Sequence, residues 1–468
     1  MVVCHAAAQD APSQTSRPYN VLFIIADDLA TTALSCYGSK VSQTPNIDAL
    51  ARRGTLFQRA YCQGSFCGPS RASMLSGYYP HAIRMLGYRS PRQAIGDRAT
   101  LPQHFKNAGY DTVRVSKVFH MGVPGDIETG ANGADDEASW TERFNSPGPE
   151  WRAPGQGETL ESNPQGEKPV MGGNTFVTLA AAGDDLVHSD GRTAAKACEL
   201  IAQHRDRPFF LAVGFVRPHV PFVAPAAYFE AFPPEAMRLP EKRRGDQGDI
   251  PKAGINYKTS QNMQMDLVRQ RKAMAGYFAA VAYMDAQVGK VIQALDEQDL
   301  TKNTVIVFTS DHGFHLGEHD FWAKVSLHEE SVRVPLILCV PGKKPAVSRA
   351  TVELLDLFPT LARLCRLDVP ARLQGLDISP LLNDPKGTVR DTAFCVNGKG
   401  FLLRSERWAY LQYGEDASGG VELYDMQRDP QQYTNLAASS EHAATVATFR
   451  VQLADKLRAL RSNDLKAP

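Results

Sequence analysis

The stretch that decides the fold is Asn20-Val21-Leu22-Phe23-Ile24-Ile25-Ala26-Asp27-Asp28. Its first seven residues form a nearly continuous apolar run with the length of a strand. A run without polar alternation is typical of a central strand that is covered on both faces. The run ends in two carboxylates, and ligand sites of open α/β sheets gather at the carboxyl ends of strands. We therefore predict an α/β protein with a site that begins at Asp27.

The rest of the ordered chain alternates between helical and strand patterns, which indicates a mostly parallel sheet flanked by helices. The predicted helices span residues 45–53 (with Thr44 as the cap), 101–108, 192–204 and 265–297. The predicted strands span residues 111–115, 209–214, 305–309 and 335–340. Two segments rich in polar residues, Gly and Pro predict a long surface excursion at 123–185 and a loop at 232–255.

The pattern changes after about residue 383. Short apolar runs at 401–404, 408–411 and 422–425 are spaced like antiparallel strands, and a last helix is predicted at 443–460. We predict a main domain at 18–383 and a smaller C-terminal α+β subdomain with an antiparallel sheet at 384–468. Residues 1–17 are expected to be a signal-peptide remnant, because of an Ala-rich segment, or a disordered tail; both alternatives stay open.

Composition excludes several classes of protein. Of the 468 residues, 43% are hydrophobic and 22% are charged, which allows a large globular core. Lys+Arg and Asp+Glu both total 51, and this balance argues against a nucleic-acid-binding protein. No apolar run approaches the length of a membrane span. The eight cysteines contain no Cys-x-x-Cys pair, so a zinc or dithiol site is not indicated.

One cysteine does lie in a pattern that predicts reactivity, the run Cys67-Gly68-Pro69-Ser70-Arg71. Pro69 suits the first turn of a helix and Gly77 suits its end, so Cys67 is expected just before a helix N-terminus. Backbone N–H groups there favour an anion. Arg71 lies one turn further on, and helical side chains lean toward the N-terminus, so its guanidinium can approach position 67. The alternative is a buried free cysteine before an ordinary helix.

A second pair of possible metal ligands, Asp311-His312, follows the predicted strand at 305–309. Three carboxylates (Asp27, Asp28 and Asp311) that meet at strand ends would repel one another unless a cation joined them. Oxygen ligands of this kind suit Ca²⁺ or Mg²⁺. Alone, the Asp27-Asp28 pair would be a turn or capping pair, but its place behind a buried strand favours a metal site.

These motifs together resemble the type I sulfatases, which share the Cys-x-Pro-Ser-Arg signature. The resemblance covers about residues 20–341 and is closest to iduronate-2-sulfatase-like members. It rests on stretches that follow the signature in the chain: Lys117-Val118-Phe119-His120, Pro218-His219-Val220-Pro221-Phe222, Leu316-Gly317-Glu318-His319 and Trp322-Ala323-Lys324. It implies an alkaline-phosphatase-like fold with a mixed, mostly parallel sheet.

The resemblance also implies a set of site residues. Cys67 would be oxidised to formylglycine (3-oxoalanine) by a formylglycine-generating or anaerobic sulfatase-maturating enzyme. Ca²⁺ would be held by Asp27, Asp28, Cys67, Asp311 and His312. His312 stands where many members of the family carry Asn, and imidazole is a softer ligand than Ca²⁺ usually takes.

The implied mechanism is covalent catalysis. One hydroxyl of the hydrated aldehyde at position 67, held by Arg71, attacks the sulfur while the metal acts as Lewis acid. Lys117 and Lys324 neutralise the sulfate oxygens. His219 protonates the leaving alcohol, and His120 then takes the proton of the second hydroxyl as sulfate leaves.

The resulting expectation is a periplasmic or secreted sulfuric ester hydrolase that acts on a sulfated carbohydrate. The specific hypothesis is a 2-O-sulfated uronate or a related polysaccharide residue, such as one of a glycosaminoglycan. One alternative is a phosphonate or phosphate diester hydrolase of the same superfamily. The other is an inactive glycan-binding relative, which loss of Cys67, Arg71 or the metal carboxylates would indicate.

Overall fold

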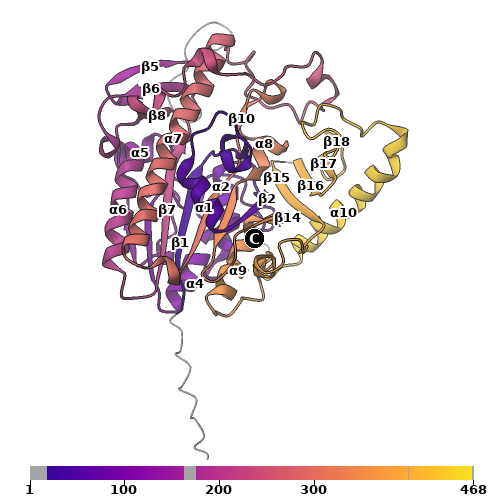
Figure 1. The fold of residues 1–468 in the computed structure, drawn as a ribbon. Helices are drawn as coiled ribbons and strands as arrows, with labels where there is room; N and C mark the ends of the chain where they lie inside the picture. The colour runs from indigo at the N-terminus through magenta and orange to yellow at the C-terminus, as the bar shows by residue number, and fades with distance from the viewer. Residues whose placement is uncertain (1–17, 163–174, 399, 466–468) are drawn as a thin grey trace, which may run out of the picture.

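A nine-stranded sheet forms the centre of the molecule. The computed structural model describes residues 18–162, 175–398 and 400–465, so the expectation for residues 1–17 lies outside the described part (Figure 1). The strand order is β12-β2-β13-β9-β1-β7-β3-β4, with β14 paired to β2. The strands are β1 Asn20–Asp27, β2 Thr55–Tyr61, β3 Asp111–Ser116, β4 Glu142–Phe144, β7 Phe209–Pro218, β9 Thr304–Ser310, β12 Arg333–Val334, β13 Leu336–Cys339 and β14 Ala346–Glu353.

The helices lie on both faces of this sheet (Figure 1). The α-helices of the described residues, including α10 of the C-terminal part, are α1 Pro45–Arg53, α2 Cys67–Ser76, α3 Arg92–Ile95, α4 Leu101–Asn107, α5 Gly125–Thr129, α6 Ser189–Gln203, α7 Leu267–Glu297, α8 Glu329–Val332, α9 Leu357–Leu364 and α10 Ala443–Arg461. No helix of the described residues is long and apolar enough to cross a membrane.

The sheet is mixed but mostly parallel, as predicted. Strands β9, β1, β7, β3 and β4 run parallel, whereas β13 runs antiparallel to both of its neighbours, β9 and β2. In the β1–β9 pair, Ala26 lies opposite Ser310. The two acidic segments that follow these strands therefore leave the sheet side by side.

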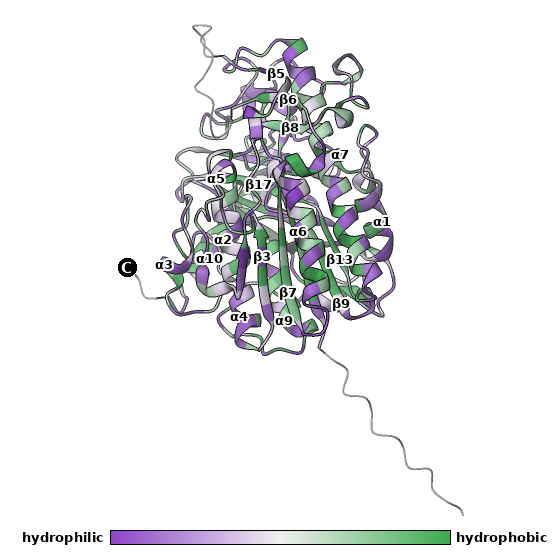
Figure 2. Cartoon of the chain, turned by 90° about the vertical axis from the view of Figure 1, so that its left-hand side faces the viewer, coloured by the Kyte–Doolittle hydropathy of each residue, from purple (hydrophilic) through white to green (hydrophobic). Residues whose placement is uncertain are grey.

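Strand β1 is buried along its whole length because both of its faces contact apolar layers. Leu22 and Ile24 belong to a core cluster that includes α6 and α7. Phe23 and Ile25 belong to a second cluster that includes α2, α4 and α9. Side chains of a strand alternate between faces, so two covered faces require an apolar residue at every position. Figure 2 shows the hydrophobic strands β3, β7, β9 and β13 in the middle of the molecule.

The C-terminal part forms its own antiparallel sheet in the order β15-β16-β17-β18, and α10 packs on it. Its strands are β15 Thr392–Asn397, β16 Gly400–Ser405, β17 Trp408–Tyr413 and β18 Gly420–Asp425. Three of these strands coincide with the predicted runs, and the α+β subdomain is confirmed. β15 is a fourth strand that the sequence reasoning missed.

The expected loop excursion at 123–185 is only partly correct. It contains α5 and β4, which extends the large sheet, and two further strands, β5 Gly155–Thr159 and β6 Val177–Ala181. These two strands join β8 Phe222–Pro225 in a small three-stranded sheet. Most of β5 is exposed to solvent, so it carries no apolar alternation that could have revealed it.

Helix α1 has the predicted bounds, but Thr44 does not cap it with its side chain. The Thr44 hydroxyl instead accepts from Ser35 N at 3.1 Å. A buried carboxylate of α7 takes the capping role: Asp285 accepts from the backbone N–H groups of Asn46 and Ile47 at 3.2 and 2.8 Å. A long-range contact therefore satisfies two N–H groups that lack partners within the helix.

Candidate active site

The candidate site lies at the carboxyl ends of β1 and β9. Asp27 ends β1 and Asp28 follows it, while Asp311 and His312 follow β9. All four side chains are buried. Asp28 has a positive φ of 66°, and its backbone is held on both sides: its N–H donates to Asp311 Oδ1 at 3.3 Å and its carbonyl accepts from Tyr277 at 2.8 Å.

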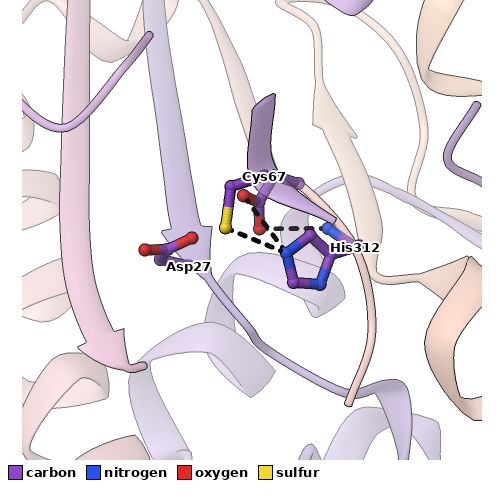
Figure 3. A group of neighbouring side chains, drawn as sticks. Asp27, Cys67 and His312 are labelled. Carbon is purple, nitrogen blue, oxygen red and sulfur yellow. Dashed lines mark hydrogen bonds and ion pairs between the residues drawn. The ribbon is translucent and has the colours of Figure 1, made fainter. Parts of the chain in front are cut away.

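Helix α2 brings Cys67 to this edge of the sheet. The helix begins at Cys67 itself, one residue earlier than expected, and ends at Gly77, which has a φ of 80°. The Cys67 Sγ atom lies 3.2 Å from His312 Nε2 and 3.9 Å from Asp28 Oδ1. Figure 3 shows Cys67 pointing toward the His312 ring, with Asp27 at the end of its strand nearby. The nucleophile candidate therefore faces the acidic residues directly.

Arg71 connects the two strand ends. Its Nε donates to Asp311 Oδ2 at 2.8 Å and its Nη2 donates to Asp27 Oδ1 at 3.1 Å. Its Nη1 donates to the backbone carbonyls of Lys117 and Val118. Burial alone would lower the pKa of Arg71, but the two carboxylates outweigh burial and raise it. The guanidinium, which we expected to approach position 67, is thus bonded to the carboxylates around it.

Two buried lysines complete the set of charges. Lys117 forms an ion pair with Asp27. The Lys324 Nζ atom donates to both oxygens of Asp28 at 2.6 and 2.8 Å and lies 3.5 Å from Cys67 Sγ. Together with Arg71, these lysines balance the three buried carboxylates, since a buried charge is costly unless it is paired.

The two candidate catalytic histidines differ in position. His219 is buried, with Nε2 3.8 Å from Asp28 Oδ2. His120 stacks on Tyr88 with ring centroids 4.3 Å apart, and its Nδ1 has no hydrogen-bond partner among the described residues. Burial and the neighbouring Lys117 lower the pKa of His120 to about 2. Burial and Lys324 likewise hold the pKa of His219 well below its usual value. Both imidazoles are therefore neutral at neutral pH.

The comparisons with known proteins agree with one another. The family model described as Sulfatase matches residues 19–367, about three quarters of the chain. A second one, described as N-sulphoglucosamine sulphohydrolase, C-terminal, matches residues 317–461. The iduronate 2-sulfatase of Homo sapiens is 34% identical over 419 residues, 79% of this chain and 73% of that protein.

A sulfatase of Formosa agariphila is 30% identical over 93% of this chain and 86% of its own length. The chain belongs to the sulfatase family. It is a sulfuric ester hydrolase and is iduronate-2-sulfatase-like, as the motifs indicated. Among solved structures, the phosphonate monoester hydrolase of Silicibacter pomeroyi has a TM-score of 0.77 at 22% identity, covering 95% of this chain and 96% of that one. This likeness establishes the alkaline-phosphatase-like fold.

The donor set of this sulfatase fits a divalent cation. Ligand atoms of Asp27, Cys67, Asp311 and His312 lie within 4.8 Å of one another. Burial raises the pKa of Asp28, and the neighbouring Asp27 and Asp311 raise it further, although Lys324 and His312 oppose this. Crowded, buried carboxylate oxygens are the ligands that Ca²⁺ prefers. The arrangement of these residues is therefore consistent with a metal centre.

The sequence reasoning missed several residues that support the site of the sulfatase. Asn256 donates to the carbonyls of Trp322 and Lys324 at 3.4 and 3.0 Å and so holds the segment that carries Lys324. Ser70 donates to the Asp311 carbonyl. These contacts join residues far apart in the chain, and the only sequence signal for any of them was the presence of Ser70 within the signature.

Replacing Arg71 with Met should lower the free energy of unfolding by about 3–5 kcal/mol, because two buried carboxylates lose their cation. Urea unfolding in the presence of EDTA measures this loss. Arg53→Met is the matched control, since the Arg53–Asp296 pair is 36% and 46% exposed and should contribute less than about 1 kcal/mol. Equal losses in the two variants would contradict the structural role of Arg71.

Proposed function

We propose that this sulfatase removes sulfate from a sulfated sugar, with a 2-O-sulfated uronate or a related polysaccharide residue as the substrate. The observation that carries the proposal is the set of charged and polar groups around Cys67. Its sulfur lies within 3.9 Å of groups on Asp28, His312 and Lys324. The name of the iduronate 2-sulfatase relative supports the sugar and the position of the ester.

The proposal takes Cys67 to be converted to formylglycine by a maturating enzyme, the formylglycine-generating type or the anaerobic type. The hydrated aldehyde supplies one hydroxyl to attack sulfur and a second hydroxyl through which the sulfate ester collapses without attack by water. The start of α2 suits such a group because backbone N–H groups of a helix N-terminus stabilise an anionic oxygen.

The two buried lysines beside the carboxylates are proposed to bind the sulfate group. In the structure each is paired with a carboxylate, Lys117 with Asp27 and Lys324 with Asp28. A bound Ca²⁺ would supply Lewis acidity and would be held by Asp27, Asp28, Asp311, His312 and position 67. The lysines are then available to neutralise the sulfate oxygens as negative charge shifts during the reaction.

The histidines are proposed to divide the proton transfers. His120 is neutral, as a base must be, and in this role it accepts the proton of the second hydroxyl. His219 is proposed to protonate the leaving sugar hydroxyl. Because its pKa is held low in the free protein, it must gain its proton when the substrate's negative charge arrives beside it.

We further propose a periplasmic or secreted location and a division of the chain into a catalytic domain at 18–383 and a C-terminal subdomain at 384–468.

The inactive glycan-binding alternative lacks support, because Cys67, Arg71 and all three carboxylates are present and gathered at one place. The phosphonate or phosphate diester alternative draws its support from the structural likeness to the phosphonate monoester hydrolase.

Cys67→Ser should reduce kcat on an aryl sulfate by a factor on the order of 10³ or more, because serine forms no gem-diol. The fold should be retained, as judged by circular dichroism. Cys198→Ser, on α6, serves as the control and should keep full activity. Mass spectrometry of the peptide that contains position 67 should show a loss of about 18 Da relative to cysteine. An unmodified, fully active enzyme would refute the mechanism.

Calcium should stabilise the protein by about 3 kcal/mol when it is present at roughly 100 times its Kd. Thermal unfolding with and without EDTA measures this difference without reference to turnover. Asp28→Asn and Asp311→Asn should abolish the difference. Asp206→Asn, an exposed carboxylate at the far end of α6, should keep it. A calcium response that survives both site substitutions would exclude the proposed ligands.

Parallel assays separate the two hydrolase functions. An aryl sulfate and an aryl phosphonate monoester both carry one negative charge, so the charge of the site accepts either. We expect kcat/KM to favour the sulfate, and 2-O-sulfated uronate disaccharides to be cleaved better than isomers sulfated elsewhere. A clear preference for the phosphonate would overturn the proposal.

A further inference from the structure

A pocket that the reaction does not use is lined by the loop between α2 and α3, by α3 itself and by Leu465 (Figure 2 labels both helices). The pocket has a volume of about 380 Å³. Its polar lining includes Arg84, Arg89, Ser90 and Gln93, and its apolar lining includes Ile83 and Met85. It therefore combines an apolar wall with two guanidinium groups, a lining that suits a sugar with an anionic substituent.

The chain itself connects this pocket to the reactive cysteine. Gly87 and Tyr88 lie between the two arginines in sequence and pack against the start of α2. A side chain on Gly68 would come within 2.3 Å of the Gly87 carbonyl oxygen. The residue next to Cys67 therefore touches the same loop that forms the pocket.

Tyr88 precedes the pocket residue Arg89 in the same loop and contacts a residue of the candidate site. Its ring stacks on His120 at 4.3 Å and meets Phe66 edge-on at 5.6 Å, so it is held from two sides. Burial raises the pKa of its hydroxyl, and charge on Cys67 raises it further. Even so, 51% of the side chain is exposed. A rigid, half-exposed aromatic ring is a surface on which a sugar can pack.

The two arginines have no carboxylate partner within residues 18–162, 175–398 and 400–465. Arg89 Nη2 donates only to the Arg84 backbone carbonyl, at 3.4 Å. Some other exposed arginines are held in ion pairs, for example Arg53 with Asp296 and Arg461 with Glu415. Arg84 also has a positive φ of 49°, an uncommon conformation for a residue with a side chain. Two unpaired cations beside a site for sulfated molecules indicate recognition of a further anionic group.

We propose that this pocket binds the carboxylate or sulfate of the sugar adjoining the sulfated sugar, with Tyr88 as the packing surface between the two. The inference rests on the proposed function and adds a specificity site to it. The substrate is then an oligosaccharide or polysaccharide with an anionic neighbour, rather than an isolated sulfated monosaccharide. Arg84 and Arg89 are binding residues and take no part in the chemical step.

The test compares wild type with the Arg84→Gln/Arg89→Gln double variant on four substrates. One is an aryl sulfate, and three are disaccharides with the same sulfated sugar and a neutral, a carboxylated or a sulfated neighbour. We expect the double variant to raise KM about tenfold on the anionic disaccharides, given the strength of exposed charge-assisted hydrogen bonds. KM on the other two substrates and kcat on all four should stay unchanged.

Comparing KM for the disaccharides with a carboxylated and with a sulfated neighbour shows which anion the pocket prefers. Arg205→Gln is the control. Arg205 lies just before the first residue of β7, Phe209, and its substitution should leave KM and kcat unchanged on all four substrates. Double substitution to Lys should restore part of the affinity, which a folding defect would not allow. An equal rise in KM on all four substrates, or no rise on any, would overturn the inference.

Calorimetry with the desulfated disaccharides measures binding to the pocket without any turnover. Here too the double variant should lose affinity only for the anionic neighbours. If wild type binds these products selectively but hydrolyses no sulfate ester, the proposed function fails and the pocket stands. If wild type hydrolyses sulfate esters but does not distinguish the neighbours, the pocket fails and the function stands.

Discussion

The bonds from Arg71 to Asp27 and Asp311 are the interactions on which the site depends. They join the ends of two parallel strands to the helix that carries Cys67. The same guanidinium binds the Lys117 and Val118 carbonyls and so fixes the segment after β3 as well. One buried cation thereby sets the distance between nucleophile, carboxylates and lysine. This is possible because α2 starts at the strand ends, which aligns its first turn with the acidic residues.

The charge balance of the site explains how so many ionised groups remain buried. Three carboxylates are paired with Arg71, Lys117 and Lys324, and none of these six side chains is more than 1% exposed. Buried ions without partners would cost several kcal/mol each. The histidines beside them stay neutral because burial and the neighbouring lysines disfavour a further positive charge. Burial is thus the main cause of their neutral state, and the lysines reinforce it.

Local patterns were sufficient to predict the central strand, the α2 helix and the acidic segments, because each has a strong signal within ten residues. Contacts between distant segments were not predictable from such signals. Asp285 caps α1 from another helix, and Asn256 holds the segment of Lys324. The guanidinium of Arg71 was expected near Cys67, but buried carboxylates need donors and take its hydrogen bonds. The exposed strand β5 carried no pattern at all.

The balanced charges also make metal and substrate binding interdependent in the proposed function. A divalent cation added to a neutral, buried site leaves an excess of two positive charges, which is unfavourable alone. A sulfate ester would bring negative charge to Lys117 and Lys324, whose carboxylate partners would be engaged by the metal. Each ligand therefore favours the other, and by linkage the coupling is the same in both directions.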